Sequence, residues 1–253
     1  AAAPPMRKVV FGTQDNQIQL GQETVMFRHE EKFYNPTALA VTVSDKLTGE
    51  DLTKRIEAVN ALQFERIGIK IGVKAIAVVN ESGSSDSFAQ AAAAVKDASK
   101  LALILVTDSP DAMAAAAAKT KDSVPLLAAA APDTAEEMAK VAKENGCPIV
   151  AKADSLDALA ELTEKIKAAG VEDIVLNFQS PDLQSQLLNL SKIRALALKK
   201  VFRPMGYPTI SYATDGNADT QVASAISLIG KYAGIVVLET VEPYAILPML
   251  TAV

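Results

Sequence analysis

From about residue 39 onward, the chain alternates between short apolar runs and longer segments with helical spacing. The apolar runs begin near Leu39, Val73, Leu101, Leu126, Ile149, Asp173, Pro208 and Ile235. Each interval between two starts can hold one strand, one helix and two short loops. The runs at 101–106 and 235–238 are continuous rather than alternating, which indicates strands buried on both faces of a parallel sheet.

The intervening segments carry signals for the start and end of helices. Thr134 and Glu137 have the spacing of a capping box, in which each side chain binds a backbone amide at the start of a helix. Gly146 predicts the end of that helix, and Gly170 predicts the end of the next one. The alanine-rich stretches at 91–94 and 114–118 predict helices that pack closely, because alanine has the highest helix propensity.

Eight consecutive strand–helix units predict an α/β fold, a (β/α)8 TIM barrel over residues 35–253. The alternative is a doubly wound open sheet, which usually has fewer strands and a glycine-rich first turn. The residues after the first predicted strand, 44–49, lack the G-x-G-x-x-G pattern, and the sequence has no Walker motif. These absences favour the barrel and give no support to nucleotide binding.

The N-terminal residues form a separate region. Residues 7–34 contain short apolar runs at 7–11, 18–20 and 24–27, which predict a β-hairpin or small meander that plugs one end of the barrel. Residues 1–6, rich in alanine and proline, predict a linker from an N-terminal domain that is missing here.

Composition narrows the class of protein. The 253 residues include 25 basic and 30 acidic side chains, a net charge of −5, which argues against nucleic-acid binding. The chain is 49% hydrophobic and 22% charged, as expected for a globular protein. No apolar run reaches the length of a membrane span, and the first residues lack the apolar core of a signal peptide. We therefore expect a cytoplasmic protein without membrane insertion.

One cysteine and one histidine limit the metal chemistry of the chain. Cys147 alone cannot build a four-thiolate zinc or iron–sulfur site, and we predict a buried structural residue rather than a reactive thiol. His29 cannot form a multi-histidine metal site, and a structural role is favoured over catalysis because no nucleophile accompanies it. A bond from Arg28 to Glu30 or another carboxylate would tie this segment to the barrel. We predict no metal site in this chain.

Polar residues at the carboxyl ends of the predicted strands are the candidates for ligand binding, because function gathers there in TIM barrels. These polar residues form one candidate set, whose members are Asp45, Asn80, Asp108, Asn177 and Glu239. Their neighbours at the same strand ends are Glu81, Tyr212, Thr214 and Thr240. The competing explanation is that they cap helices, a position that Asp, Asn, Ser and Thr favour.

The carboxyl ends of the predicted strands together form the mouth of the barrel, and the residues there can support few kinds of ligand binding or catalysis. The candidate set has no Lys or Arg, which makes it a poor site for phosphate, although amides and carboxylates could bind a flat heterocycle such as a pterin. Asp45 and Glu239 could act as an acid–base pair if they lie close together. Residues 128–131 and 151–153 leave half of the mouth nearly featureless, which weakens the case for an autonomous enzyme.

Seven segments, which include the block Phe27-Arg28-His29-Glu30, carry a resemblance to a known family. They are 23–33, 35–45, 169–176, 188–194, 206–210, 231–238 and 244–251. Together they resemble the large (gamma) subunit of the corrinoid iron–sulfur protein of acetyl-CoA decarbonylase/synthase systems. The resemblance implies a subunit with a four-cysteine [4Fe–4S] domain, a central TIM barrel and a corrinoid-binding domain, of which this chain is the barrel.

The resemblance implies further cofactors and partners. The whole protein would carry a corrinoid and a [4Fe–4S] cluster in the missing domains, with no cofactor in this segment. It would pair with the small (delta) subunit as a heterodimer, and would pass a methyl group from a methyl-tetrahydropterin, through a methyltransferase, to the acetyl-CoA synthase/CO dehydrogenase.

Three hypotheses for function follow. The leading one is a scaffold and interaction domain of that methyl carrier, with no catalytic residues and no turnover by this chain alone. The alternative is a pterin-binding methyltransferase barrel that holds the heterocycle with Asp45, Asn80, Asp108 and Asn177. The third is a barrel enzyme whose small-molecule substrate cannot be identified from the sequence.

Overall fold

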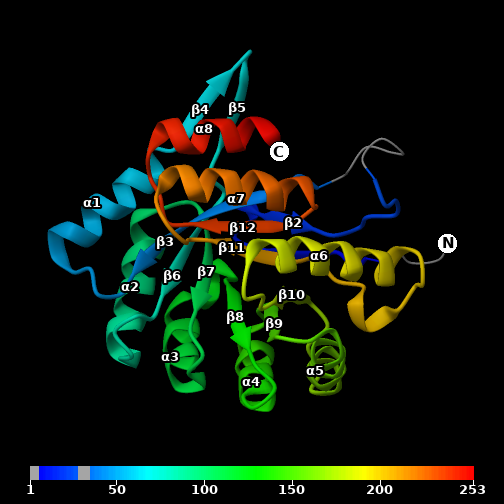
Figure 1. The fold of residues 1–253 in the computed structure, drawn as a ribbon. Helices are drawn as coiled ribbons and strands as arrows, with labels where there is room; N and C mark the ends of the chain where they lie inside the picture. Colours follow the sequence, from blue (N-terminus) through cyan, green and yellow to red (C-terminus); the bar gives the residue numbers. More distant parts are fainter. Residues whose placement is uncertain (1–5, 28–34) are drawn as a thin grey trace.

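Eight parallel strands form the centre of the computed structural model, which describes residues 6–27 and 35–253 (Figure 1). Around the sheet their order is β10-β9-β8-β7-β6-β3-β12-β11. Their bounds are β3 (Ala38–Ser44), β6 (Ala75–Val79), β7 (Ala102–Val106), β8 (Leu126–Ala130), β9 (Ile149–Ala153), β10 (Ile174–Phe178), β11 (Ile210–Ala213) and β12 (Ile235–Leu238).

The two ends of this sheet meet between β10 and β11. The backbone amide of Leu176 donates to the carbonyl oxygen of Pro208 at 2.8 Å, and the Asn177 side-chain amide donates to the carbonyl of Ile210 at 3.1 Å. These bonds close the sheet into a barrel. The predicted TIM barrel is confirmed, and the open doubly wound sheet is excluded.

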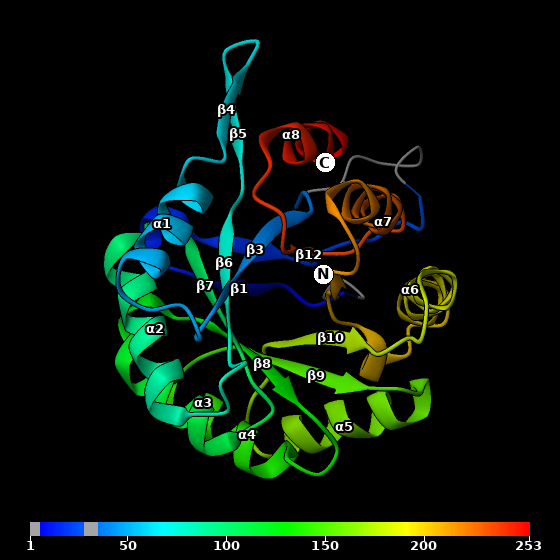
Figure 2. The same ribbon diagram turned by 60° about the vertical axis from the view of Figure 1, so that its left-hand side comes forward.

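Eight helices follow the strands and surround the barrel (Figure 2). Their bounds are α1 (Gly49–Asn60), α2 (Ser85–Ala98), α3 (Pro110–Thr120), α4 (Ala135–Asn145), α5 (Leu156–Ala168), α6 (Leu183–Leu198), α7 (Ala218–Gly230) and α8 (Pro243–Ala252). Within the described residues, none of these helices is both long and apolar enough to cross a membrane.

The helix starting at residue 135 is confirmed, but its predicted capping box is wrong. Thr134 has φ −106° and ψ 5°, outside the extended region of a normal N-cap, and it makes no side-chain cap bond. Its hydroxyl instead accepts the backbone amide of Ala131 at 3.1 Å, in the preceding turn. The predicted end is confirmed, since Gly146 lies in the left-handed region with φ 65° and its amide donates to the last turn.

Alternate residues of each strand enter two different parts of the core. Leu39, Ile76 and Leu103 face outward and pack against the helices. Residues of the opposite parity face inward, and on three neighbouring strands most of these are alanines. The inward alanines are Ala38, Ala40, Ala75, Ala77 and Ala102. Both faces of the strands are buried, which explains their continuous apolar runs.

An antiparallel pair of short strands fills the space that the small alanines leave. β1 (Val9–Phe11) pairs with β2 (Ile18–Leu20), and both pack in the same cluster as the inward-facing alanines. Since Ala38, Ala75 and Ala102 are the first or nearly first residues of their strands, the pair closes the amino-terminal end of the barrel, as predicted.

Of the two forms predicted for the N-terminal region, the described residues show the hairpin and not the meander, which would need a third strand. Residues 24–27 form no strand, because Arg194 of α6 binds the carbonyl oxygens of Val25 and Met26 that a strand partner would otherwise use. The interpretations of Arg28, His29 and Glu30 lie outside the described residues, as do residues 1–5 of the predicted linker.

The sequence interpretation missed a second hairpin between α1 and β6. Its strands β4 (Gln63–Arg66) and β5 (Ile69–Gly72) pair with each other in a two-stranded sheet. Because it precedes β6, the hairpin lies at the amino-terminal end of the barrel, and it projects from the body of the molecule in both ribbon views (Figures 1 and 2).

Candidate functional site

A cavity of about 510 Å³ opens at the carboxyl ends of the strands. Strand ends from β6 to β11 and the loop between β10 and α6 line it. The polar residues among its lining include Asn80, Asp108, Lys152, Asn177, Ser180 and Tyr212. Three of the five predicted site residues, Asn80, Asp108 and Asn177, are therefore brought together here.

The two asparagines of the cavity also hold the barrel rim. The side-chain amide of Asn80 donates to the Thr107 hydroxyl at 3.0 Å, and its carbonyl oxygen accepts the amide of Gly83 at 3.0 Å. Asn177 is only 5% exposed, and its amide is the donor that bridges β10 to β11 at the closing seam. These hydrogen bonds hold both side chains in place, so a ligand in the cavity would contact two asparagines of fixed orientation.

An ion pair crosses the neighbouring part of the mouth. Asp108, after β7, pairs with Lys152, on β9. The lysine side chain is 18% exposed and the aspartate 72% exposed. The prediction that residues 151–153 leave this part of the mouth nearly featureless is therefore wrong. Lys152 lies two residues after Val150 on β9, and Val150 faces inward. Because side chains two residues apart on a strand lie on the same face, Lys152 also points into the barrel.

Two hydroxyl groups of the cavity lining, those of Tyr212 and Ser180, are buried. Burial raises the pKa of the Tyr212 phenol, and the nearby charge of Asp108 raises it further. The phenol therefore stays protonated at neutral pH and can donate a hydrogen bond. The Ser180 hydroxyl oxygen is buried without a hydrogen-bond partner among the residues that the structure describes. These groups give the cavity polar atoms that a small ligand could engage.

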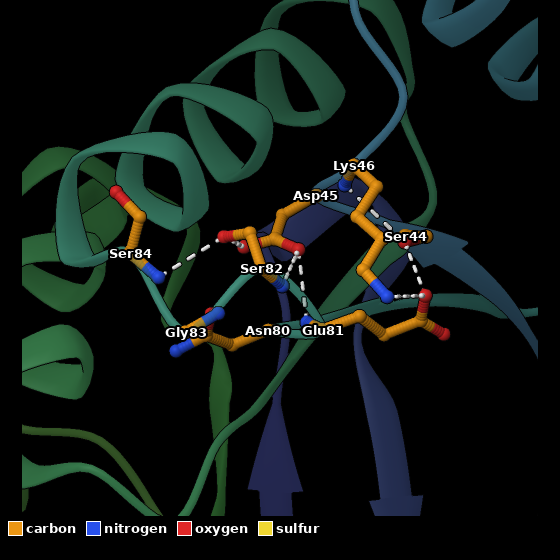
Figure 3. A network of polar contacts seen from close by, with 8 residues as sticks. All are labelled: Ser44, Asp45, Lys46, Asn80, Glu81, Ser82, Gly83 and Ser84. Atoms are coloured by element: carbon orange, nitrogen blue, oxygen red, sulfur yellow. Dashed lines mark hydrogen bonds and ion pairs between the residues drawn. The ribbon is translucent and has the colours of Figure 1, made fainter.

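Asp45 does not belong to the cavity. Its carboxylate accepts the backbone amides of Glu81 and Ser82 at 2.9 and 2.8 Å, and the Ser82 hydroxyl at 2.6 Å (Figure 3). Its side chain is buried in these contacts, with the residue 2% exposed. Asp45 therefore shapes the loop before α2 and is a structural residue.

The loop around Asp45 contains a second, exposed set of contacts. Glu81 accepts the Ser44 hydroxyl at 2.7 Å and lies 3.8 Å from the Lys46 ammonium (Figure 3). These bonds hold the ends of β3 and β6 together, and Glu81 is not among the residues that line the cavity.

Glu239 also lies outside the cavity lining. Its backbone amide donates to the Gln221 side chain at 3.1 Å, and its carbonyl oxygen accepts the guanidinium of Arg55. Burial lowers the pKa of Arg55, while the charge of Glu239 opposes that shift. Since neither Asp45 nor Glu239 lines the cavity, the structure does not support them as an acid–base pair acting on a ligand there.

Two further neighbours at the strand ends have different positions. Thr214 lines the cavity. Thr240 instead donates its backbone amide to the Gln221 side chain at 2.9 Å, so it belongs with Glu239 to the loop that follows β12.

The described part of the chain, residues 6–27 and 35–253, contains no group of three His, Cys, Asp or Glu side chains that could hold a metal ion. Cys147 is buried, as predicted. Desolvation raises the pKa of its thiol to about 11, although the charge of Lys121 opposes this shift. A thiol with this pKa is almost entirely protonated at neutral pH and is a poor nucleophile.

The fold of the chain is similar to that of dihydropteroate synthases of known structure. The 7,8-dihydropteroate synthase of Vibrio fischeri ES114 superimposes with a TM-score of 0.66, with 97% of each chain covered and 12% sequence identity. At that identity the similarity concerns the fold alone. Residues 8–253 match the family model for the CO dehydrogenase/acetyl-CoA synthase delta subunit, and the chain belongs to this family.

The family model is named for the delta subunit, whereas two of the most similar curated relatives are named large or gamma subunits. The chain is 40% identical over 251 residues to the corrinoid/iron-sulfur protein large subunit of Moorella thermoacetica, covering 99% of this chain and 56% of that protein. It is 35% identical over 264 residues to the acetyl-CoA decarbonylase/synthase complex subunit gamma of Methanothermobacter thermautotrophicus, covering 98% and 57%. The resemblance seen in the sequence is confirmed, and the chain spans just over half the length of these relatives.

Proposed function

We propose that this chain is the barrel domain of a corrinoid iron–sulfur methyl carrier. As a whole, that protein would pass a methyl group from a methyl-tetrahydropterin, through cobalt, to acetyl-CoA synthase during acetyl-CoA synthesis or cleavage. One observation carries the proposal: the 40% identity to the Moorella large subunit extends over 99% of this chain but only 56% of that subunit. The part of such a subunit that this chain does not match is long enough to contain cofactor domains.

The donor groups of this chain do not fit an iron–sulfur cluster. A [4Fe–4S] cluster takes four thiolates, whereas the sequence has one cysteine, and the pKa of that buried thiol is raised. A cobalt ligand from histidine would have to be His29, which is the one histidine of the sequence. The proposal therefore assigns the corrinoid and the cluster to domains outside these residues, and no step of methyl transfer to this barrel.

In this proposal the barrel is a rigid platform for other proteins. Its partners would be the small (delta) subunit, in a heterodimer, together with the methyltransferase and the acetyl-CoA synthase/CO dehydrogenase. The names of the relatives support the coarser statement that proteins of this kind are subunits of a complex. A cytoplasmic location follows from this role.

Metal analysis and methyl transfer test the proposal on the full-length protein that contains this chain, purified without oxygen from its source. We expect cobalt and iron in the full-length protein, and methylation of its cobalt by a methyl-tetrahydropterin and the methyltransferase. The chain of residues 1–253, tested in parallel, should contain neither metal and accept no methyl group. A full-length protein without cobalt, or methyl transfer by the barrel alone, would overturn the proposal.

The second candidate is a pterin-binding barrel, favoured by one observation. The cavity brings Asn80, Asp108 and Asn177 together with the Tyr212 phenol, and such a set can bind the amide edge of a heterocycle. Calorimetry with methyltetrahydrofolate distinguishes the two candidates. Binding with a Kd near or below about 100 μM, weakened by Asn177→Ala, would support a pterin site. If no heat of binding is detected at that concentration, the pterin site is excluded and only the platform role remains.

A further inference from the structure

The hairpin of β4 and β5 carries an apolar stripe that continues beyond the body of the protein. Phe64 pairs with Ile71 near its base, and both are partly buried against the helix-facing core. Further out, Ile69 is 66% exposed, and Ile67 at the tip is 92% exposed. The stripe therefore begins in the core and ends in solvent.

The tip of this hairpin is strained as well as exposed. Ile67 and Gly68 have φ values of 51° and 74°, so both lie in the left-handed region of a two-residue hairpin turn. Asn-Gly is the preferred sequence for such a turn, whereas a β-branched residue is a rare outlier there. Ile67 thus adds backbone strain and an exposed apolar side chain, and neither of these stabilises the folded chain.

The surroundings of the stripe are basic. Arg66 lies opposite Ile69 on the face of the stripe, Lys70 lies opposite Glu65 on the other face, and Lys74 follows two residues after β5. The hairpin and the residues just after it thus carry three basic groups against one acid, although the chain as a whole has a net charge of −5. Lys70 and Ile71 also line a cavity of about 620 Å³ at the base of the hairpin, together with Leu250 at the end of α8. A partner that covers the stripe would need an apolar pocket with acidic residues around it.

We infer that the β4–β5 hairpin is a docking element that inserts Ile67 and Ile69 into an apolar pocket, rimmed by acidic residues, on a different protein subunit. A second copy of this chain fits less well, because a two-fold symmetric contact would place two basic hairpins against each other. The inference rests on the proposed function, in which the occupant is the small subunit of the carrier.

Ile67→Asn is the informative variant because we expect it to preserve or increase the stability of the chain while weakening its binding to the partner. Asn-Gly relieves the strained turn, so the melting temperature of the variant should be equal to or higher than that of the original chain. The variant also removes the apolar side chain that would be buried in the partner's pocket, so the Kd for the partner should rise about tenfold or more. A residue with a purely structural role would not combine retained stability with weakened binding.

Three further variants accompany it in the full-length protein. Ile69→Thr keeps a β-branched strand residue and removes apolar surface, and Arg66→Glu reverses a charge beside the stripe; both should also weaken binding. Leu188→Gln is the matched control. Leu188 is 55% exposed on α6, which follows β10, four strands away from β6 in the barrel. This control should leave the Kd unchanged.

The probe is the purified small subunit, with binding measured by calorimetry and the assembly checked by analytical ultracentrifugation. If the original protein binds the small subunit and the hairpin variants bind it equally well, the docking inference is overturned while the proposed function stands. If the original full-length protein does not bind the small subunit at all, the partner named in the proposed function is wrong. Self-association that Ile67→Asn abolishes would overturn the choice of a different subunit as occupant.

Discussion

The Arg194 guanidinium lies over the ring of Tyr232, with its central carbon 4.4 Å from the ring centroid. The same guanidinium pairs with Glu23 and donates to the backbone carbonyl of Met26 at 2.8 Å. The Arg194 side chain is only 5% exposed. One cation of α6 therefore holds the segment before residue 28 against the barrel, through charge, hydrogen bonds and a cation–π contact.

Removing this cation should strongly destabilise the chain. Arg194→Met removes the guanidinium that pairs with the Glu23 carboxylate, which is 11% exposed, and we expect a loss of about 3–5 kcal/mol in the free energy of unfolding. Arg194→Lys keeps the charge but loses the planar fork that reaches several acceptors, so we expect an intermediate loss of about 1–3 kcal/mol. Urea unfolding followed by circular dichroism measures both.

Lys54→Met is the control for this comparison. Lys54 and Glu50 form an exposed pair one helical turn apart, at 2.7 Å, and its loss should cost at most about 0.5 kcal/mol. An Arg194→Met variant as stable as this control would show that the buried cluster contributes nothing to folding.

The strand pair at the base of the barrel should be necessary for stability. Phe11 is 1% exposed and packs among the inward-facing alanines, which are too small to collapse into the space that its loss would leave. Phe11→Ala should therefore lower the free energy of unfolding by about 3–5 kcal/mol. Phe202→Ala, at a site 43% exposed, is the matched control and should have a much smaller effect in the same thermal or urea unfolding experiment.

The barrel could be predicted because its strands are buried on both faces. Each of the eight strands begins within two residues of a start taken from the apolar runs, as Leu126 and Ile149 do without any shift. The β4–β5 hairpin could not be found in this way. It is largely exposed, its strands are four residues each, and its turn has Ile67 where Asn would have marked a hairpin.

The candidate site could be predicted only in part, and strand parity explains the errors. Asp108, Lys152 and Tyr212 share the parity of the inward-facing residues of their strands and line the cavity. Asp45 has the parity of Val41 and Val43, which face the helices, so it is directed away from the cavity. Asn80 has this outward parity too and, like Asp45, directly follows the last residue of its strand, yet it lines the cavity. Such a change of direction at a strand end depends on tertiary contacts.

The role of Asp45 in holding the loop at 81–82 predicts a graded effect of its replacement. Asp45→Ala removes the acceptor of two backbone amides and should cost about 2–4 kcal/mol of unfolding free energy. Asp45→Asn keeps one acceptor oxygen and should cost less than half as much. Equal losses in the two variants, measured by urea unfolding, would contradict the hydrogen-bonding role assigned to this carboxylate.

Cys147 should make the stability of the chain depend on alkaline pH. Its thiol has a pKa of about 11 in the folded chain, against an ordinary value of 9.0. The raised pKa means that the folded state retains the proton, so the contribution of the thiol is fully present below pH 9 and is lost as pH rises from 9 to 11. The whole loss amounts to about 3 kcal/mol, because each pKa unit corresponds to about 1.4 kcal/mol.

Comparison with Cys147→Ala isolates this effect from the lysines that titrate in the same range. The difference in unfolding free energy between the original chain and the variant should be constant from pH 7 to about pH 8.5 and should then decrease steadily toward pH 11. Alkylation by iodoacetamide gives an independent measurement. At pH 8 the folded chain should react at a small fraction of the rate of the urea-unfolded chain, because burial suppresses both access and ionisation. A pH-independent difference, together with fast alkylation of the folded chain, would mean that the thiol is accessible and has the same pKa in the folded chain as in the unfolded chain.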